Sequence, residues 1–195
     1  LLGVDGGAAP GLRHRAMVLA WLVLDQPRWT EFDAHYLPDP AHPVARLSEP
    51  RNYRESADDP AGVTVLCAEI PCWEGDATWT AGPDAIGATV AAALAGEGLP
   101  PVRPVAVELA HLPRVYPLYP PGFERSLAAT EAAVARAGAG RVVTLGRQGL
   151  FAPDNTHHVM AMGRAAAAGL RPDGSLDAAR WSAARADFHG HVVED

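Results

Sequence analysis

Residues 144–170 constrain the fold of this chain more than any other stretch of it. They begin within a short, mostly apolar run, residues 142–145, which is typical of a strand buried in a parallel sheet. A Gly146-Arg147 pair follows, and the chain then returns through Asp154-Asn155 into small residues that predict a helix over 156–168. The order strand, turn, loop and helix therefore predicts an α/β unit in this part of the chain.

The start of that helix has a chemistry suited to a polar or anionic ligand. Its first N–H groups have no intrahelical partner and the helix dipole is positive there, so an oxygen of a phosphate or an enolate can bind. Asp154 can accept hydrogen bonds from a hydroxylated chain. Asp and Asn are also preferred helix N-caps, so a purely structural role stays open.

The rest of the chain predicts short strands and helices separated by prolines. Apolar or β-branched runs predict strands over residues 15–25, 45–48, 62–70 and 102–112, the third of them ending at Pro71. Amphipathic or small-residue stretches predict helices over residues 86–95, 123–137 and 176–186. We therefore expect an α/β (α+β) fold, with a mixed, largely antiparallel sheet, flanking helices and a C-terminal strand–helix piece.

Composition excludes several classes of function. All 16 basic residues are Arg, they are scattered, and the net charge is -7, so we expect no nucleic-acid partner. The longest apolar run, residues 16–24, is far shorter than the roughly 20 residues that a membrane-spanning helix needs. The two cysteines, Cys67 and Cys72, are expected to be free thiols, which fits a cytoplasmic protein.

The segment that opened this section carries a family resemblance. A strand, Gly146-Arg147, a loop with Gly149, Asp154-Asn155 and an Ala/Gly helix together resemble the C-terminal motif of the flavin-containing amine oxidase and protoporphyrinogen oxidase superfamily. Residues 112–119, followed by Gly122 and a helix, are similar to the passage from the substrate domain back to the FAD domain. Residues 13–18 and 47–53 resemble substrate-domain segments.

The resemblance implies a division of the chain and a cofactor. Residues 1–120 would form a substrate-domain-like region, residues 121–170 the C-terminal segment of an FAD domain, and residues 171–195 a helical tail. The intact enzyme would bind FAD and a small-molecule substrate, and would pass a hydride from a substrate C–H to the flavin N5.

It also implies roles for single residues near the flavin. Asp154 would hold the ribityl chain, and the backbone of Asn155, Thr156 and His157 would face the pyrimidine edge of the reduced flavin. Arg147 would contact cofactor or substrate. The aromatic residues Tyr116 and Tyr119 would line the substrate face, although aromatic packing is an equal alternative for both.

The sequence departs from the family in one large respect. The family begins with a strand, G-x-G-x-x-G and a helix, which no segment of this chain matches. We therefore expect the chain to be incomplete alone and to need the missing FAD-domain portion or another copy of itself as partner. The alternative is a stand-alone non-redox binding module, or a cyclase or isomerase, derived from the substrate domain.

No catalytic residue is assigned, and no metal site is expected. Glu49 and Glu69 are candidates for acid or base, without a paired carboxylate that supports either role. His35 with His42, and His189 with His191, are histidine pairs, but no Cys, Asp or Glu completes a recognisable metal site with either pair.

Overall fold

The computed structural model describes residues 11–54, 56–188 and 190–191. The chain divides into two compact units, one of residues 15–115 and one of residues 1–14 with 116–195. We call them the sheet unit and the helical unit. Two strands, β1 (Arg13–Leu24) and β5 (Ala106–Leu118), each cross the division between the units.

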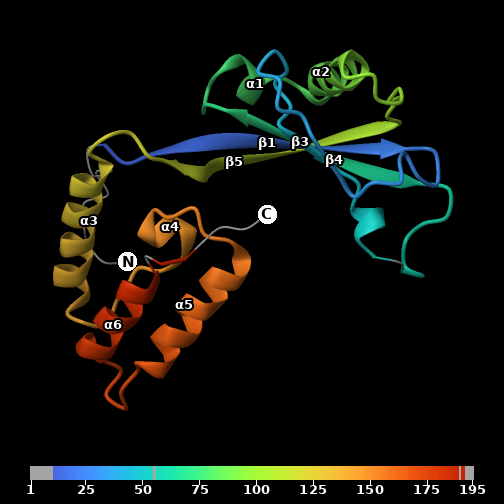
Figure 1. The fold of residues 1–195 in the computed structure, drawn as a ribbon. Coiled ribbons are helices and arrows are strands. Elements are labelled where there is room, and N and C mark those ends of the chain that lie inside the picture. The colour runs from blue at the N-terminus through green and yellow to red at the C-terminus, as the bar shows by residue number, and fades with distance from the viewer. Residues whose placement is uncertain (1–10, 55, 189, 192–195) are drawn as a thin grey trace. The chain divides into compact units, whose positions relative to one another are not determined.

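A five-stranded sheet is the centre of the sheet unit (Figure 1). Its strand order is β2-β3-β4-β1-β5, where β2 is Ala34–Tyr36, β3 is Arg46–Ser48 and β4 is Thr64–Cys72. The pairs β1·β4, β3·β4 and β2·β3 are antiparallel, and Figure 1 shows β5 running opposite to β1. The predicted mixed α/β class with an antiparallel sheet is therefore confirmed.

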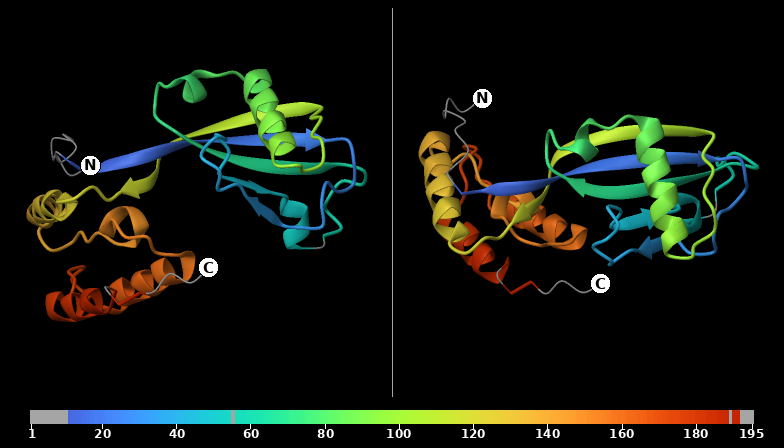
Figure 2. Two further views of the ribbon diagram at one scale, coloured as in Figure 1. Left: turned by 45° about the horizontal axis from the view of Figure 1, so that its top comes forward. Right: turned by 90° about the horizontal axis from the view of Figure 1, so that it is seen from above.

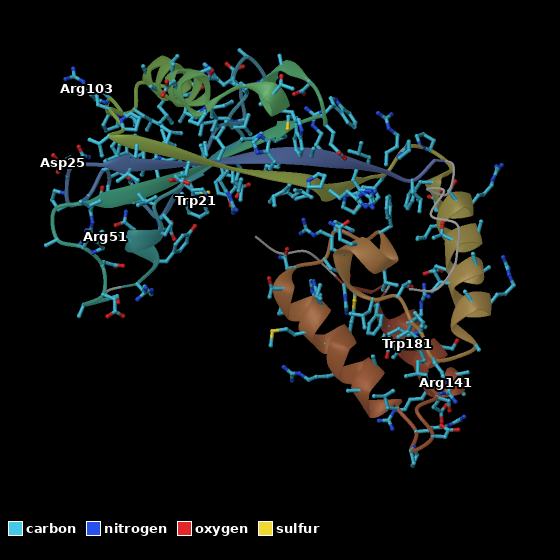
Figure 3. All side chains as sticks on the ribbon, turned by 180° about the vertical axis from the view of Figure 1, so that it is seen from behind. Trp21, Asp25, Arg51, Arg103, Arg141 and Trp181 are labelled. Carbon is cyan, nitrogen blue, oxygen red and sulfur yellow. The ribbon has the colours of Figure 1, made fainter. Side chains whose placement is uncertain are left out.

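One face of this sheet is buried, because every second residue of β1 and β4 on that face is apolar. Val18, Ala20 and Leu22 of β1 are fully buried, and they lie opposite Ile70, Ala68 and Leu66 of β4. Helix α2 (Pro83–Gly96) covers this face with Ile86, Val90 and Leu94, and the short α1 (Ala77–Thr80) lies on the same side (Figures 1 and 2). In Figure 3, Trp21 lies on the opposite side of the sheet, as the alternation of a strand requires.

Strand β4 does not end at Pro71, so that expectation was wrong. Since Ala45 donates its N–H to the carbonyl of Glu69, the odd-numbered residues of β4 direct their backbone groups toward β3. The pairing of β3 with β4 covers only residues 67–69 of β4, so the missing N–H of Pro71 leaves no ladder bond unmade.

Strand β5 is shifted relative to its prediction for the same reason. It begins at Ala106 rather than 102 and continues through Pro113 and Pro117 to Leu118. It is the terminal strand of the sheet order, and an edge strand tolerates prolines that a central strand does not.

The helical unit contains α3 (Phe123–Gly138), α4 (Gly146–Leu150), α5 (Thr156–Ala168) and α6 (Ala178–Phe188), shown in Figure 1. The helix predictions over 123–137 and 156–168 are confirmed, and the predicted helix over 176–186 is found two residues later. The prediction of a buried strand over residues 142–145 was wrong. These residues are half-buried and have no ladder partner among the described residues, because all five strands of the sheet lie elsewhere.

Candidate functional site

The N-terminus of α5 is closed by a reciprocal pair of hydrogen bonds. The side chain of Asn155, the N-cap, accepts from the backbone N–H of His158, and Nδ1 of His158 accepts from the backbone N–H of Asn155 at 3.2 Å. Asn155 therefore has the structural role that its position before the helix allowed. The N–H groups of Thr156 and His157 lie in the same first turn, and both side chains are exposed.

Asp154, immediately before this cap, is a buried carboxylate whose two oxygens differ. Only 5% of the residue is exposed. Oδ1 lies 3.2 Å from Nδ1 of His191 and 3.6 Å from Nδ1 of His158. Oδ2 is buried and has no hydrogen-bond partner among the described residues. A buried carboxylate oxygen without a donor is costly, so it marks a place where a ligand would be stabilising.

Arg147 of α4 fixes the loop that carries Asp154. Its Nε and one terminal nitrogen donate to the backbone carbonyl of Asp154 at 3.1 and 3.0 Å. The guanidinium also lies 5.5 Å from the ring centroid of Tyr116, within the range of a cation–π contact. Arg147 thus binds the main chain of the loop and an aromatic ring.

A cavity of about 460 Å³ adjoins Asp154 in the helical unit. Asp154 and His191 are among its polar residues, and its aromatic wall comes from Tyr119, Phe123, Phe151 and Phe188. The ring of Tyr119 packs against those of Phe123 and Phe151, with distances between ring centroids of 5.4 and 6.0 Å. Burial raises the pKa of the Tyr119 phenol, against an opposing effect of Arg147. The cavity is of the size that small-molecule sites have.

Phe151 is held in an unusual backbone conformation at the edge of this cavity. It is the C-cap of α4, with φ 54° and ψ 47°, in the left-handed region. A bulky residue there costs of order 1–3 kcal/mol, and such strain is frequent at binding sites.

The structure gathers most, but not all, of the residues that the sequence predicted. Arg147, Asp154, Asn155 and the first turn of α5 lie together, and Tyr119 lines the same cavity as Asp154. Tyr116 contacts Arg147 through its ring and so lies beside these residues. The exposed side chains of Thr156 and His157 leave only their backbone N–H groups for the predicted role.

Two histidines near Asp154 were missed as functional residues. His158 lies four residues after Asp154 and is 9% exposed. Burial lowers its pKa, and electrostatic interactions with the neighbouring His157 and His191 lower it further. Its i, i+4 spacing from Asp154 was the available signal. His191 comes from beyond α6 and had no local signal. Its expected companion His189 lies outside the described residues.

In the sheet unit, the two glutamates considered as acid or base have other partners. Glu49 is 1% exposed and accepts from Trp29 N, Thr30 N, Asn52 Nδ2 and Thr64 Oγ1 at 2.7 to 3.1 Å. Glu69 accepts from Arg46, and this pair raises the pKa of the guanidinium. Burial raises the pKa of Cys67 to about 11, so its thiol is a poor nucleophile.

The comparisons with known proteins give a fold and no family. No family model matches the chain, and no curated protein matches it. Among solved structures, the chain is similar to reduced UDP-galactopyranose mutase, with a TM-score of 0.54 and 14% identity. A protein from Exiguobacterium sp. 255-15, described as a proposed protoporphyrinogen oxidase, matches over 65% of this chain and 28% of its own, with 16% identity and a TM-score of 0.48.

The mutase match covers 71% of this chain and 29% of the mutase chain. This chain therefore has the fold of part of that enzyme and spans less than a third of its length. No helix among the described residues is both long enough and apolar enough to cross a membrane.

Proposed function

We propose that this chain supplies the closing part of the cofactor site of an FAD-dependent oxidoreductase of the amine oxidase or protoporphyrinogen oxidase type. One observation carries the proposal. The buried carboxylate of Asp154, with Oδ2 unpartnered among the described residues, lies directly before the first turn of a helix and beside an aromatic cavity. A hydroxylated, partly aromatic ligand such as a flavin matches both features.

Each residue would act on the cofactor through the atoms that the fold leaves for it. Oδ2 of Asp154 would accept a hydrogen bond from a ribityl hydroxyl, and the first-turn N–H groups of α5 would face the pyrimidine edge. Arg147 would hold the loop, and the rings of Tyr116 and Tyr119 would lie toward the substrate. The flavin, when bound, supplies the hydride chemistry, with a substrate C–H next to nitrogen or in a ring as the donor.

The proposal requires a second polypeptide segment for the nucleotide end of FAD. Since no G-x-G-x-x-G segment lies in this sequence, the adenosine and pyrophosphate contacts would come from a complementing FAD-domain portion or from another copy of the chain. Both cysteines are free thiols, which fits the reducing cytoplasm.

The test is a titration of the full chain with FAD, whose flavin and ribityl end this chain would bind without the nucleotide contacts, followed by flavin fluorescence. We expect Asp154→Asn to weaken binding about 10- to 100-fold, because a hydrogen bond to a charged group contributes about 1.5–3 kcal/mol. Asp173→Asn is the matched control, because Asp173 is an exposed aspartate of the same unit that accepts hydrogen bonds from Ser175. Equal affinity of wild type and Asp154→Asn would contradict the proposed role of Asp154.

A second candidate is a non-redox binding module or an isomerase. The similarity in fold to UDP-galactopyranose mutase favours this second candidate, because a mutase rearranges its substrate without net oxidation. A wild-type chain that shows no change in flavin fluorescence at any FAD concentration, while binding a nucleotide sugar such as UDP-galactose in calorimetry, would favour this candidate over the first.

A further inference from the structure

Three side chains from separate parts of the helical unit meet around one point. Asp154 comes from the loop after α4, His158 from the first turn of α5, and His191 from the segment after α6. One ligand atom of each lies within 4.8 Å of the others. We propose that Asp154, His158 and His191 bind a divalent transition-metal ion, with Zn²⁺ as the best match.

Two of the three distances between these atoms are close to those of a tetrahedral site, and the third, between the two histidine nitrogens, is at most 4.8 Å. Zn–N and Zn–O bonds of about 2.0–2.2 Å at a tetrahedral angle place neighbouring ligand atoms roughly 3.3 Å apart. Oδ1 of Asp154 lies 3.2 Å from Nδ1 of His191 and 3.6 Å from Nδ1 of His158. These two pairs of ligand atoms therefore need to move little for an ion to bind between them.

The donor set and its surroundings also favour a cation. Two imidazoles with one carboxylate are a common zinc combination. Asp154 is 5% exposed, and its Oδ2 has no partner among the described residues, so the carboxylate carries buried negative charge that a cation would neutralise. The rings of His158 and His191 are stacked, with centroids 4.4 Å apart and planes 15° from parallel, so one imidazole would have to turn about its Cβ–Cγ bond for both rings to bind one ion in their planes.

The nearby positive charges are engaged elsewhere. Arg147 donates to the backbone carbonyl of Asp154, not to its carboxylate. Arg185, which lines the adjoining cavity, forms an ion pair with Glu131 at 2.7 Å. Neither guanidinium occupies the place of the ion.

One hydrogen bond must give way when the ion binds. Nδ1 of His158 accepts from the N–H of Asn155, which shows that this nitrogen carries a lone pair and not a proton. Zn²⁺ would take that lone pair, and the second bond of the cap, from the backbone N–H of His158 to the Asn155 side chain, would remain. The ion would then tie the segment after α6 to the start of α5.

Three protein ligands leave a fourth position of the tetrahedron for water. Asp154 and His191 both line the aromatic cavity, so this position would open toward it. Zinc sites with three protein ligands and one water are the catalytic type, whereas structural sites have four protein ligands. The site would therefore admit a small oxygen or nitrogen ligand from the cavity.

This inference does not rest on the proposed flavin function, although both involve Asp154. Zn²⁺ would bind Oδ1 and the ribityl hydroxyl would bind Oδ2 of the same carboxylate, and each ligand has its own probe. Zn²⁺ binding is measured without flavin, and FAD binding is measured after treatment with a chelator. Either result can fail while the other holds.

The test is calorimetric titration of the metal-free full chain with ZnCl₂, together with the visible spectrum of its Co²⁺ complex. We expect one ion bound with the intense d–d bands of four-coordinate cobalt. Loss of a neighbour of a metal ligand already weakens binding about 10- to 100-fold, so loss of a ligand in Asp154→Asn or His191→Gln should weaken Zn²⁺ binding by more than about 100-fold.

Two controls separate this site from others. A second group, Asp39, His42 and Glu97 in the sheet unit, is also close enough to bind a metal, so the titration is repeated in His42→Gln, where we expect the same tight ion. His111→Gln removes an exposed histidine outside both groups and should leave the affinity for Zn²⁺ unchanged. Zn²⁺ should also raise the melting temperature of wild type and not of His191→Gln. Tight binding that survives both Asp154→Asn and His191→Gln, or the absence of binding to wild type, would overturn the proposal.

Discussion

Two buried carboxylates show how much the surroundings of one residue decide its role. Glu49 and Asp154 are both almost inaccessible to water. Four donors from the main chain and side chains satisfy both oxygens of Glu49. Asp154 has neighbours at Oδ1 only. Glu49 is therefore a structural anchor of the segments around it, and Asp154 is the carboxylate that retains capacity for a ligand.

At the residue scale, we predict that Glu49→Gln destabilises the chain by about 3 kcal/mol. The amide nitrogen of Gln would face groups that donate hydrogen bonds, and donors left without an acceptor in a buried place cost about 1–3 kcal/mol each in unfavourable cases. The free energy of unfolding is measured by urea denaturation.

The matched control for this prediction is Glu69→Gln. Its partner Arg46 has a side chain that is 38% exposed and can be solvated again, so we expect a loss below about 1 kcal/mol. If the two variants were equally stable, the four hydrogen bonds of Glu49 would not have the stabilising role assigned to them.

At the scale of a single element, the cap of α1 predicts a dependence on pH. Asp76 accepts from the backbone N–H of Trp79 at 2.8 Å and of Trp73 at 2.7 Å, and these bonds lower its pKa. We expect Asp76→Ala to cost about 1 kcal/mol at pH 7. A lowered pKa in the folded state means that the charged cap stabilises above the unfolded pKa of about 3.9 and loses this effect as the pH falls through the folded value.

The measurement is the free energy of unfolding of wild type and Asp76→Ala from pH 7 to pH 3. The difference should be constant down to about pH 5 and should shrink below about pH 4. Asp84→Asn is the comparison, because Asp84 lies in the first turn of α2, whose N-cap has no side-chain cap bond. A difference that grows in acid would contradict the assigned cap.

Sequence patterns predicted elements best where local chemistry decides them. Helix α5 was found with its predicted bounds, because an Asn N-cap and a run of small residues are local signals. The strand over 142–145 was wrong, because apolar residues predict burial but not the presence of a partner strand. The course of β4 through Pro71 depended on the short length of β3, which no signal near Pro71 contains.

The candidate site was predictable to the same extent. Arg147, Asp154 and the first turn of α5 are close in sequence and in space, so a motif could identify them. His191 meets Asp154 only because α6 returns the chain to α5, through the loop in which Leu170 bridges Leu176. The metal group was therefore not expected, since its third member is set by tertiary structure.

At the scale of the whole molecule, the apolar core is concentrated in one part of the chain. The core cluster of buried residues lies entirely between Ala16 and Val102, within the sheet unit. In the described part of the helical unit, the buried apolar side chains are those of Pro117, Phe151, Met162 and Trp181. Since burial of apolar surface is the main stabilising term in folding, most of it is available to the sheet unit by itself.

This concentration predicts that a piece of residues 11–118, which keeps β1 and β5 whole, folds without the rest of the chain. Its size and single core fit a domain with a free energy of unfolding of about 5–10 kcal/mol. Urea denaturation followed by tryptophan fluorescence should give one cooperative transition.

Within this piece Leu22→Ala, at a fully buried position of β1, should lower the free energy of unfolding by about 3 kcal/mol, whereas Val105→Ala, at an exposed position, should change it by less than about 0.5 kcal/mol. A broad, non-cooperative transition, or equal effects of the two substitutions, would mean that the core between Ala16 and Val102 is not sufficient and that the sheet needs residues beyond 118 to form.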